Sequence, residues 1–352
     1  MALDDLLTAV RVGDPQLSPD GRVLYVRTTT DISSGKRNSD IWMVRADGSA
    51  APAPFIASPK SDDSPRFLAD GRVAFISTRD GAPQVYVADA GGANIRAVTH
   101  LSAGVQPPLV ISPDGTMVAF VSDVFPTCAD EACNTRMREA AEKDPVKAHS
   151  LTRLPFRHWN EWWETGRHHV FVSDIESGAT RDVTPGDFDA PPHNYEDGAI
   201  AFSADSRELA FVSKRGAKDT EMWTTNHDVW TVPASGGTAK KLTSNPAADM
   251  QPTYSPDGKW IVVRSQRRAG TRASGRIGRS VSTGGGIRHR CEVIAGCSDG
   301  SLPRLHQWND AATHARERGV AWRRGPPTAG EPDGDGRRGR SRAVLDAQAS
   351  RL

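Results

Sequence analysis

A short polar turn followed by an apolar strand recurs five times along the chain and constrains its fold more than any other feature. The turns are Ser18-Pro19-Asp20-Gly21, Ala69-Asp70-Gly71, Ser112-Pro113-Asp114-Gly115, Ser203-Ala204-Asp205-Ser206 and Ser255-Pro256-Asp257-Gly258. Proline fixes the first corner of such a turn, aspartate bonds the backbone that follows, and glycine takes the positive φ angle. Self-similar units of roughly 40–45 residues that are built from strands indicate the blades of a β-propeller.

A second apolar run follows the first four copies, at residues 40–44, 84–88, 169–173 and 228–232. Each of these runs leads into a glycine-containing turn, and short polar outer strands come next, as at 95–99 and 239–243. β-Branched and aromatic residues dominate the runs, as in strands that pack between blades. The sequence therefore predicts an all-β fold: an incomplete β-propeller of four blades and part of a fifth, which receives no second strand.

The composition changes abruptly near residue 270. Residues 1–270 have a net charge of −6, whereas residues 271–352 have 15 Arg, no Lys and a net charge of +7. All ten Phe and all four Tyr precede residue 271, so the last 82 residues have little apolar material with which to form a core. We therefore expect a propeller over 1–268 and a tail over 269–352 that is disordered or translated out of frame.

Several partners and cofactors are not expected. Arg337-Arg338-Gly339-Arg340 is basic, but no folded nucleic-acid-binding motif accompanies it, so we expect no nucleic-acid partner. The cysteine and histidine spacings fit no standard metal site, and no phosphate-binding loop is present, so we expect neither metal nor cofactor. His168 and His169 are adjacent on a strand and face opposite sides, which favours surface and packing roles.

The N-terminus and two cysteines indicate in which compartment the protein occurs and whether it contacts a membrane. No run approaches the ~20 apolar residues of a membrane span, so we expect no membrane contact. The segment from Met1 to Val10 is acidic and amphipathic and lacks the features of a signal peptide, which predicts a cytoplasmic protein as written. A truncated N-terminus would leave a periplasmic or secreted protein as the alternative. Cys128 and Cys133 are close enough for a disulfide, which would suit an oxidising compartment, or they are two free thiols.

An insertion over residues 123–167 interrupts the third copy of the repeat. Asn134 to Ala148 predicts a short charged helix that ends at Asp144-Pro145. The segment from Arg153 to Glu164 follows, with three tryptophans in five residues flanked by arginine, histidine and carboxylates. Tryptophan combines a large apolar area with a polar N–H group, so this composition suits either a pocket wall or a loop anchor.

The sequence of the insertion also resembles that of a known family. Arg157-His158-Trp159-Asn160-Glu161-Trp162, followed by the segment from Gly166 to Val172, resembles the prolyl oligopeptidase family of serine peptidases. The dipeptidyl-peptidase V and acylaminoacyl-peptidase-like branch is the most similar. The opening from Arg11 to Gly21 and the loop Phe125-Pro126-Thr127-Cys128 are similar to this branch as well. The resemblance extends over residues 1 to about 268.

This resemblance implies a propeller that caps and gates a C-terminal α/β-hydrolase domain carrying Ser, Asp and His, with peptides as substrates. The last 82 residues are too few for such a domain. Gly296-Cys297-Ser298-Asp299-Gly300 satisfies the G-x-S-x-G pattern, but the later His306 and His314 leave no room for the intervening strands. We therefore predict no catalytic residues and no catalysis by this chain alone. A TolB-like propeller that acts as a binding or scaffold protein is the alternative.

The candidate substrate-binding residues lie in the tryptophan-rich segment. In related dipeptidyl peptidases propeller carboxylates hold the free amino terminus of the substrate, and Glu161 and Glu164, near Arg157, Trp159 and Trp162, resemble such carboxylates. Alternatively, both acids pair with neighbouring arginines and only fix the loop. We also expect open blade edges to favour self-association.

Overall fold

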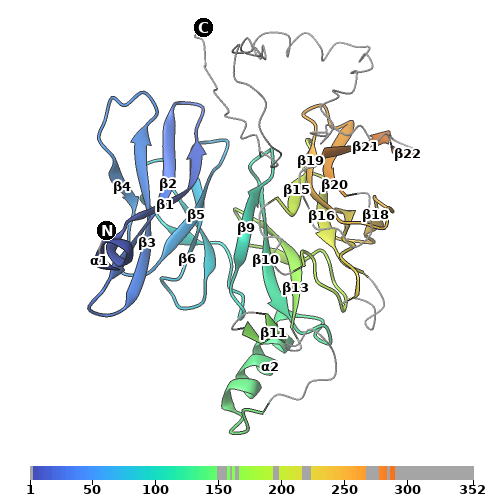
Figure 1. The fold of residues 1–352 in the computed structure, drawn as a ribbon, viewed down its shortest axis with the longest axis horizontal. Helices are drawn as coiled ribbons and strands as arrows, with labels where there is room; N and C mark the ends of the chain where they lie inside the picture. Colours follow the sequence, from blue (N-terminus) through green and yellow to red (C-terminus); the bar gives the residue numbers. More distant parts are fainter. Residues whose placement is uncertain are drawn as a thin grey trace, which may run out of the picture. The chain divides into compact units, whose positions relative to one another are not determined.

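Five antiparallel four-stranded sheets follow one another along the described part of the chain (Figure 1). The computed structural model describes residues 3–148, 157–158, 161–162, 166–192, 198–215, 223–266, 277–283 and 286–289. Side chains are described for residues 5–148, 166–192, 198–215 and 223–266. The chain divides after Gly300 into two compact units, and all described residues lie in the first.

Each sheet is one blade, and the blades are numbered 1 to 5 in chain order. Blade 1 consists of β1 (Arg11–Leu17), β2 (Arg22–Asp31), β3 (Lys36–Arg45) and β4 (Ala53–Ile56), and blade 2 of β5 (Asp62–Phe67), β6 (Val73–Ser77), β7 (Gln84–Ala88) and β8 (Arg96–Ala97). Blade 3 consists of β9 (Gln106–Ile111), β10 (Met117–Val124), β13 (Arg167–Asp174) and β14 (Thr180–Asp182), and blade 4 of β15 (Ile200–Phe202), β16 (Glu208–Ser213), β17 (Asp228–Pro233) and β18 (Lys240–Lys241). Blade 5 consists of β19 (Asp249–Tyr254), β20 (Trp260–Ser265), β21 (Ile277–Thr283) and β22 (Gly286–His289). The predicted all-β propeller is confirmed, and the apolar runs at 40–44, 84–88, 169–173 and 228–232 lie in β3, β7, β13 and β17.

The repeated turn joins the first two strands of each blade and has the predicted chemistry. In blade 3 the Asp114 carboxylate accepts hydrogen bonds from the Ser112 hydroxyl, at 2.6 Å, and from the Thr116 amide, at 3.0 Å. Gly115 takes a φ of 74°, which glycine adopts without a steric penalty. Because the turn fixes where β10 begins, it also sets the register of the strand that leads to the insertion.

The first strand of every blade precedes the turn, and the sequence analysis missed it. Four of them, β1, β5, β9 and β19, contain proline and polar residues, which weaken the sequence pattern of a strand, and β15 has only three residues. Irregular pairing accommodates them: Asp14, Ser64 and Gln251 have φ angles near 50° at equivalent places in β1, β5 and β19. The first strands of consecutive blades contact one another, so they lie where the blades converge.

The hydrophobic core consists of four apolar layers, one between each pair of consecutive blades. Between blades 1 and 2, for example, Leu24 and Ile41 pack with Phe75, and all three are fully buried. On β1 of blade 1, by contrast, Val12 and Leu17 are 67% and 69% exposed. Most strand residues of blade 1 are only half-buried, because only one of its faces carries a neighbouring blade among the described residues.

The fifth blade has more strands than the sequence predicted. No second strand was expected after residues 260–263, but β21 pairs with β20, and β22 pairs with β21. Both strands lie beyond residue 268, in the stretch assigned to the tail. An unpaired strand edge accepts a partner through its backbone N–H and C=O groups, so pairing needs no strong apolar pattern in the added strand. The rest of the predicted tail, residues 269–276, 284–285 and 290–352, lies outside the described residues.

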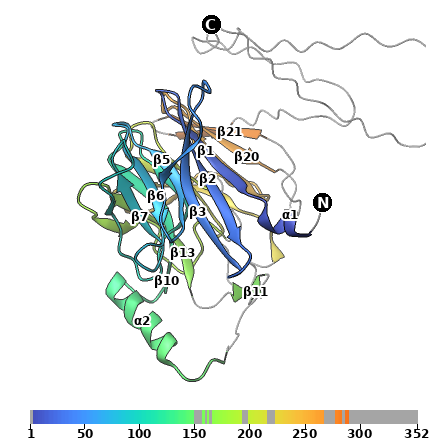
Figure 2. The ribbon, with the colours of Figure 1, turned by 90° about the vertical axis from the view of Figure 1, so that its left-hand side faces the viewer.

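The insertion leaves blade 3 between β10 and β13. Its helix α2 spans Glu131–Lys143 and therefore begins earlier than the predicted Asn134. The side chain of Asp130 caps the helix by accepting a hydrogen bond from the Cys133 amide at 2.8 Å, an N-cap that the prediction overlooked. Cys133 also forms a disulfide with Cys128. Figures 1 and 2 show α2 at the end of blade 3 opposite its Ser112–Gly115 turn.

The chain also has a short N-terminal helix, α1 (Leu3–Thr8). Neither helix is long and apolar enough to cross a membrane, and the same holds for every helix among the described residues.

Candidate functional site

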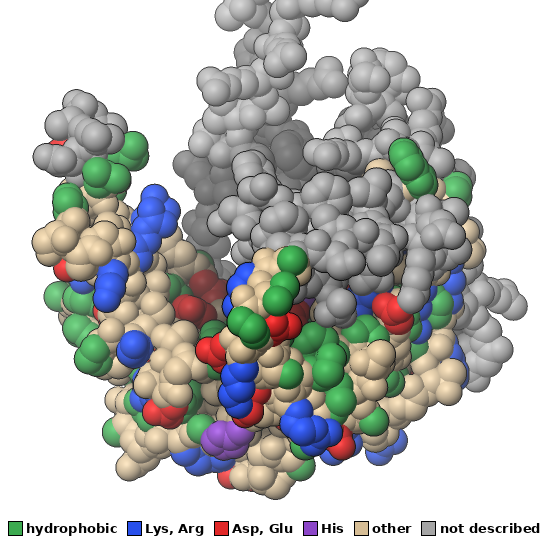
Figure 3. All heavy atoms as spheres, turned by 90° about the horizontal axis from the view of Figure 1, so that it is seen from below, with side chains coloured by type: hydrophobic (Ala, Val, Ile, Leu, Met, Phe, Trp, Pro, Cys, Tyr) green, Lys and Arg blue, Asp and Glu red, His purple; other side chains and the backbone are tan. Residues whose placement is uncertain are grey.

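The candidate site is the end of the blades at which the insertion emerges, which we call the insertion face. There the second strand of each blade ends and the third begins, at Ser77 and Gln84 in blade 2, Val124 and Arg167 in blade 3, and Ser213 in blade 4. Figure 3 shows the described side chains from the side on which α2 lies, with acidic and basic groups interspersed among hydrophobic ones.

A buried cluster of charges fixes one base of the insertion, by which we mean the end where its chain enters β13. Arg167, whose side chain is only 7% exposed, donates to Asp187 at 2.9 Å and to Asp189 at 3.0 Å. Asp189 also accepts from the His168 amide, at 3.0 Å, and its backbone carbonyl accepts from the Ser213 hydroxyl, at 2.8 Å. Since Ser213 belongs to blade 4, this cluster joins the insertion to two blades.

The other base of the insertion, where its chain leaves β10, is held by contacts with α2. The Asn134 side chain accepts a hydrogen bond from the Phe125 amide at 2.8 Å, and Arg138 donates to the carbonyl of Asp123 at 2.5 Å. The Arg138 guanidinium also lies over the Phe125 ring, 5.2 Å from its centre. These contacts orient α2 relative to β10 and so determine where the rest of the insertion starts.

The predicted substrate-binding residues lie between these two bases. Arg157 and Glu161–Trp162 belong to a small hairpin of β11 (Arg157–His158) and β12 (Glu161–Trp162), in which Arg157 pairs with Trp162. Trp159 and Glu164 lie outside the described residues, as do the side chains of the hairpin. The hairpin therefore places the backbone of Arg157, Glu161 and Trp162 together, and their binding role stays a prediction.

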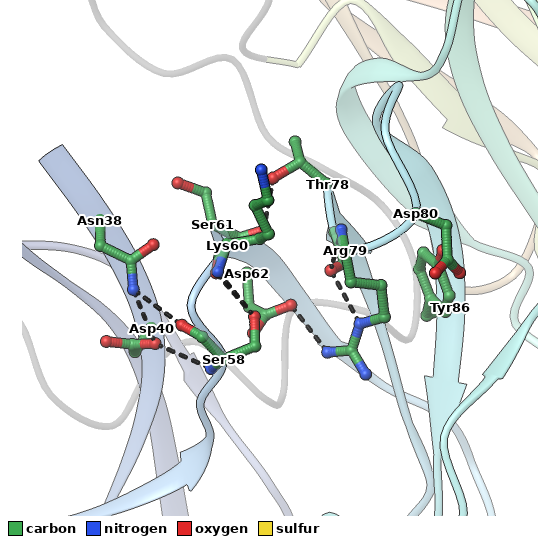
Figure 4. Close-up of polar contacts among 11 residues, drawn as sticks. Asn38, Asp40, Ser58, Lys60, Ser61, Asp62, Thr78, Arg79, Asp80 and Tyr86 are labelled. Atoms are coloured by element: carbon green, nitrogen blue, oxygen red, sulfur yellow. Dashed lines mark hydrogen bonds and ion pairs between the residues drawn. The ribbon is translucent and has the colours of Figure 1, made fainter. Parts of the chain in front are cut away.

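A second polar cluster occurs where blades 1 and 2 meet (Figure 4). Asp62, which is completely buried, accepts a hydrogen bond from Arg79 at 2.8 Å. The Nε of Arg79 donates to the Ser77 hydroxyl at 2.9 Å, and its guanidinium lies 5.2 Å and 5.0 Å from the ring centres of Phe75 and Tyr86. Charge pairing and ring contact thus hold this arginine in one orientation.

The neighbours of this cluster titrate abnormally. Burial, together with a 2.6 Å hydrogen bond from the Tyr86 hydroxyl to Asp80, raises the pKa of Tyr86 to about 12. Burial also raises the pKa of Asp40, and the nearby charge of Asp62 adds to the effect. Figure 4 shows Asp40 on the blade 1 side of the cluster, beside Ser58. Acids with a raised pKa occur at functional sites, although structural networks produce them too.

A third arginine, Arg215, lies among aromatic rings at the equivalent end of blade 4. Its guanidinium is 3.8 Å from the ring centre of Phe188 and 4.3 Å from that of Trp230. Burial lowers the pKa of Arg215 to about 10. Arg79 and Arg215 were not predicted from the sequence, although a signal was present: both end a Ser-x-Arg pattern that begins at the last residue of the second strand of their blade.

One histidine–aspartate pair has the appearance of catalytic machinery but is structural. The Nδ1 of His169 lies 2.6 Å from Asp182, and its Nε2 lies 2.8 Å from the carbonyl oxygen of Gly186. A general base must keep one ring nitrogen for the proton of the nucleophile. Both nitrogens of His169 face oxygen acceptors and the ring is buried, so His169 packs the blade, as the sequence suggested. Among the residues with described side chains, no cluster of His, Cys, Asp or Glu suitable for a metal ion occurs.

Comparison with known proteins finds relatives of this chain among peptidases. Dipeptidyl-peptidase 5 of Porphyromonas endodontalis is 29% identical over 278 residues, which cover 77% of this chain and 39% of that protein. Dipeptidyl-peptidase 5 of Porphyromonas gingivalis is 28% identical over 75% of this chain and 38% of its own length. This confirms the resemblance to the dipeptidyl-peptidase V branch. The chain thus spans about two fifths of the curated relatives it matches, in their N-terminal propeller region.

The structural comparison agrees. Acylaminoacyl peptidase of Pyrococcus horikoshii superposes with a TM-score of 0.56 over 81% of this chain and 40% of that protein, at 14% sequence identity. At this identity the superposition shows that the propeller fold is shared. No protein-family model matches the chain.

Proposed function

We propose that this chain forms the substrate-gating propeller of a serine peptidase of dipeptidyl-peptidase or acylaminoacyl-peptidase type, and that its ligands are peptides. The observation that carries the proposal is the sequence similarity to Dipeptidyl-peptidase 5 over 77% of the chain. We assign bond cleavage to the part of such a peptidase that lies outside this similarity.

The insertion face is the surface that we propose for peptide contact. Both bases of the insertion are fixed by buried or capped polar contacts, through Arg167 on one side and Asn134 on the other. A loop anchored at both ends by rigid strands positions side chains more accurately than a free loop does. In this proposal Glu161 and Glu164 hold the free amino terminus of a peptide, and Trp159 and Trp162 form the walls of the site.

The second part of the proposal is that this chain does not hydrolyse peptides by itself. The experiment treats the purified chain with a fluorophosphonate, which labels activated serines, and assays hydrolysis of a chromogenic dipeptide. We expect neither labelling nor hydrolysis. Hydrolysis that disappears in Ser298→Ala but persists in the control Ser301→Ala would overturn this part and identify the nucleophile.

The gating role is tested in an intact relative, the dipeptidyl-peptidase 5 of Porphyromonas endodontalis. The residue aligned with Glu161 is replaced by alanine, and KM is measured for a peptide with a free amino terminus and for its acetylated form. We expect KM to rise for the free peptide only, because a charge-assisted hydrogen bond to the ammonium group is lost. Equal changes for both peptides would contradict the role given to Glu161 and favour a loop-fixing ion pair or a scaffold function.

We also propose that the protein works in an oxidising compartment. The disulfide between Cys128 and Cys133 supports this, since such bonds persist in the periplasm and outside the cell and are rare in the cytosol. Thiol alkylation of the protein in intact cells, followed by mass spectrometry, tests it. Two alkylated cysteines in the Cys128–Cys133 peptide would favour the cytoplasm.

A further inference from the structure

Blade 1 has a face that no other described blade covers, which we call its outer face. Leu24 and Ile41 point from the middle strands of blade 1 into the apolar layer that it shares with blade 2. Since alternate residues of a strand point to opposite sides, the residues that flank Leu24 and Ile41 in their strands point away from blade 2. Cross-strand pairing gathers six apolar residues on the outer face: Val12, Leu17, Val23, Tyr25, Trp42 and Val44.

The outer face repeats a feature that blades 2, 3 and 4 bury. In each of these blades an aromatic pair lies across the two middle strands: Phe75–Tyr86, Phe120–Phe171 and Phe211–Trp230. Each pair packs into the layer shared with the preceding blade. The corresponding pair of blade 1 is Tyr25–Trp42, because Tyr25 follows its turn glycine by four residues, as Phe75 does. No described blade precedes blade 1, so its outer face has the composition of a surface that packs against another sheet.

Exposed apolar side chains concentrate at this blade. Val12 and Leu17 are 67% and 69% exposed, and the four outer-face residues of β2 and β3 are half-buried. Leu6 and Leu7 of α1, which contacts β2, are exposed as well (Figure 2). Of the nine large apolar residues that are exposed among the described side chains, six lie within residues 6–32. An exposed apolar patch of this kind marks a surface that binds another protein.

The outer face also has the residue types and the charge of a protein–protein interface. Tyr, Trp and Arg contribute most of the binding energy in such interfaces, and the Arg27 guanidinium lies 4.5 Å from the centre of the Trp42 ring. On this side each charged residue of β2 stands opposite one of the other sign on β3, in the pairs Arg27–Asp40 and Asp31–Lys36. These four residues have no net charge, whereas the propeller as a whole is acidic. Two copies of the chain therefore repel each other least where these faces meet.

We propose that the outer face of blade 1 binds the outer face of a second copy of this chain, so that the protein forms a dimer with two-fold symmetry. In such a dimer the same patch of both copies meets, and the two sheets pack face to face as successive blades do. Tyr25 and Trp42 lie at the centre of the contact, and Val12 and Leu17 lose their exposure to water. The proposal is independent of peptide binding, since neither its residues nor its test involves a peptide.

Sedimentation velocity of the full chain over a range of protein concentrations measures the association. Leu17→Asp tests the outer face, and it changes an exposed side chain, so the fold of a single copy should stay intact. The matched control is Val146→Asp, because Val146 is 66% exposed but follows α2 in the insertion. Circular dichroism verifies that both variants are folded. Hydroxyl-radical footprinting with mass spectrometry then compares the oxidation of Tyr25 and Trp42 at low and high protein concentration.

We expect a monomer–dimer equilibrium in which association stops at two copies, because a two-fold contact leaves no further copy of the same face open. Leu17→Asp should raise the dissociation constant of the dimer at least about tenfold, since a carboxylate buried in an apolar interface loses its water and gains no partner. Val146→Asp adds the same charge and should leave the dissociation constant unchanged. The oxidation of Tyr25 and Trp42 should fall when the dimer forms.

Four results would overturn the inference. The first is a chain that stays monomeric at every concentration. The second is a dimer that Leu17→Asp weakens no more than Val146→Asp does, which would place the contact at another surface, such as a strand edge. The third is a series of species larger than a dimer that grows with concentration, which would indicate head-to-tail packing of blades. The fourth is equal oxidation of Tyr25 and Trp42 in the monomer and the dimer.

Discussion

The buried cluster at the base of the insertion predicts a large loss of stability for Arg167→Met. Methionine keeps the apolar stem but removes the charge, which leaves Asp189 with a side chain only 8% exposed and one remaining hydrogen bond, from the His168 amide. Breaking a buried pair by removing one partner costs about 3–5 kcal/mol. The lost pair with the more exposed Asp187 adds at most about 1 kcal/mol. Because one hydrogen bond to Asp189 remains, we expect a loss of about 3 kcal/mol, at the low end of the range for buried pairs.

The matched control is Arg72→Met. Arg72 also makes two ion pairs, with Asp70 at 2.7 Å and Glu176 at 2.6 Å, but these acids are 52% and 67% exposed. Exposed pairs contribute about 0–1 kcal/mol, so the control should lose no more than that. Urea unfolding followed by tryptophan fluorescence measures both variants. If Arg167→Met loses no more stability than Arg72→Met, burial does not decide the strength of these pairs, and the anchoring role given to Arg167 is refuted.

Three further predictions concern single side chains. Tyr86→Phe removes the tyrosine with a pKa of about 12, so spectrophotometric titration should lose one late-ionising group; an unchanged curve would contradict the assignment. Gly104→Ala brings a Cβ atom to 2.8 Å from Pro83 and should cost about 1–3 kcal/mol more in urea unfolding than Gly48→Ala, which meets no atom within 4 Å. Burial lowers the pKa of His227 from 6.5 to about 4, so the unfolded chain takes up a proton that the folded chain does not. Stability present above pH 6.5 should therefore fall as the pH drops toward 4, and His227→Gln should flatten this decline; an equally steep decline in His227→Gln would contradict it.

The sequence predicted the middle strands of the blades because those strands are rich in apolar residues, and in blades 2 to 4 they are buried on both faces. It missed the first strands, whose pattern is interrupted by residues such as Pro15 and Pro65. Those strands are held by backbone pairing and irregular register, as at Asp14 and Ser64, which an apolar pattern does not reveal. The missed strands of blade 5 have the same explanation, because their pairing depends on the open edge of β20.

The candidate site was harder to predict than the fold. The composition of the insertion drew attention to Glu161 and the tryptophans, since three tryptophans in five residues are conspicuous in a sequence. Arg167, Asp187 and Asp189 are conspicuous only in space, because a charge pair separated by 22 residues leaves no local pattern. Arg79 and Arg215 did leave one, the repeated Ser-x-Arg, but the repeat alone does not say which arginine has a carboxylate partner.

The differences between equivalent positions therefore carry more functional information than the repeat does. A residue that recurs in every blade serves what all blades need, such as the aspartate of the turn that starts the second strand. Where one blade lacks what another has, the common structural need does not explain the site. Blade 2 neutralises Arg79 with Asp62, whereas Nε and Nη2 of Arg215 in blade 4 make no hydrogen bond. Asp189 pairs with Arg167 through its carboxylate and accepts a hydrogen bond from Ser213 through its backbone carbonyl, so one residue joins the insertion to blade 4.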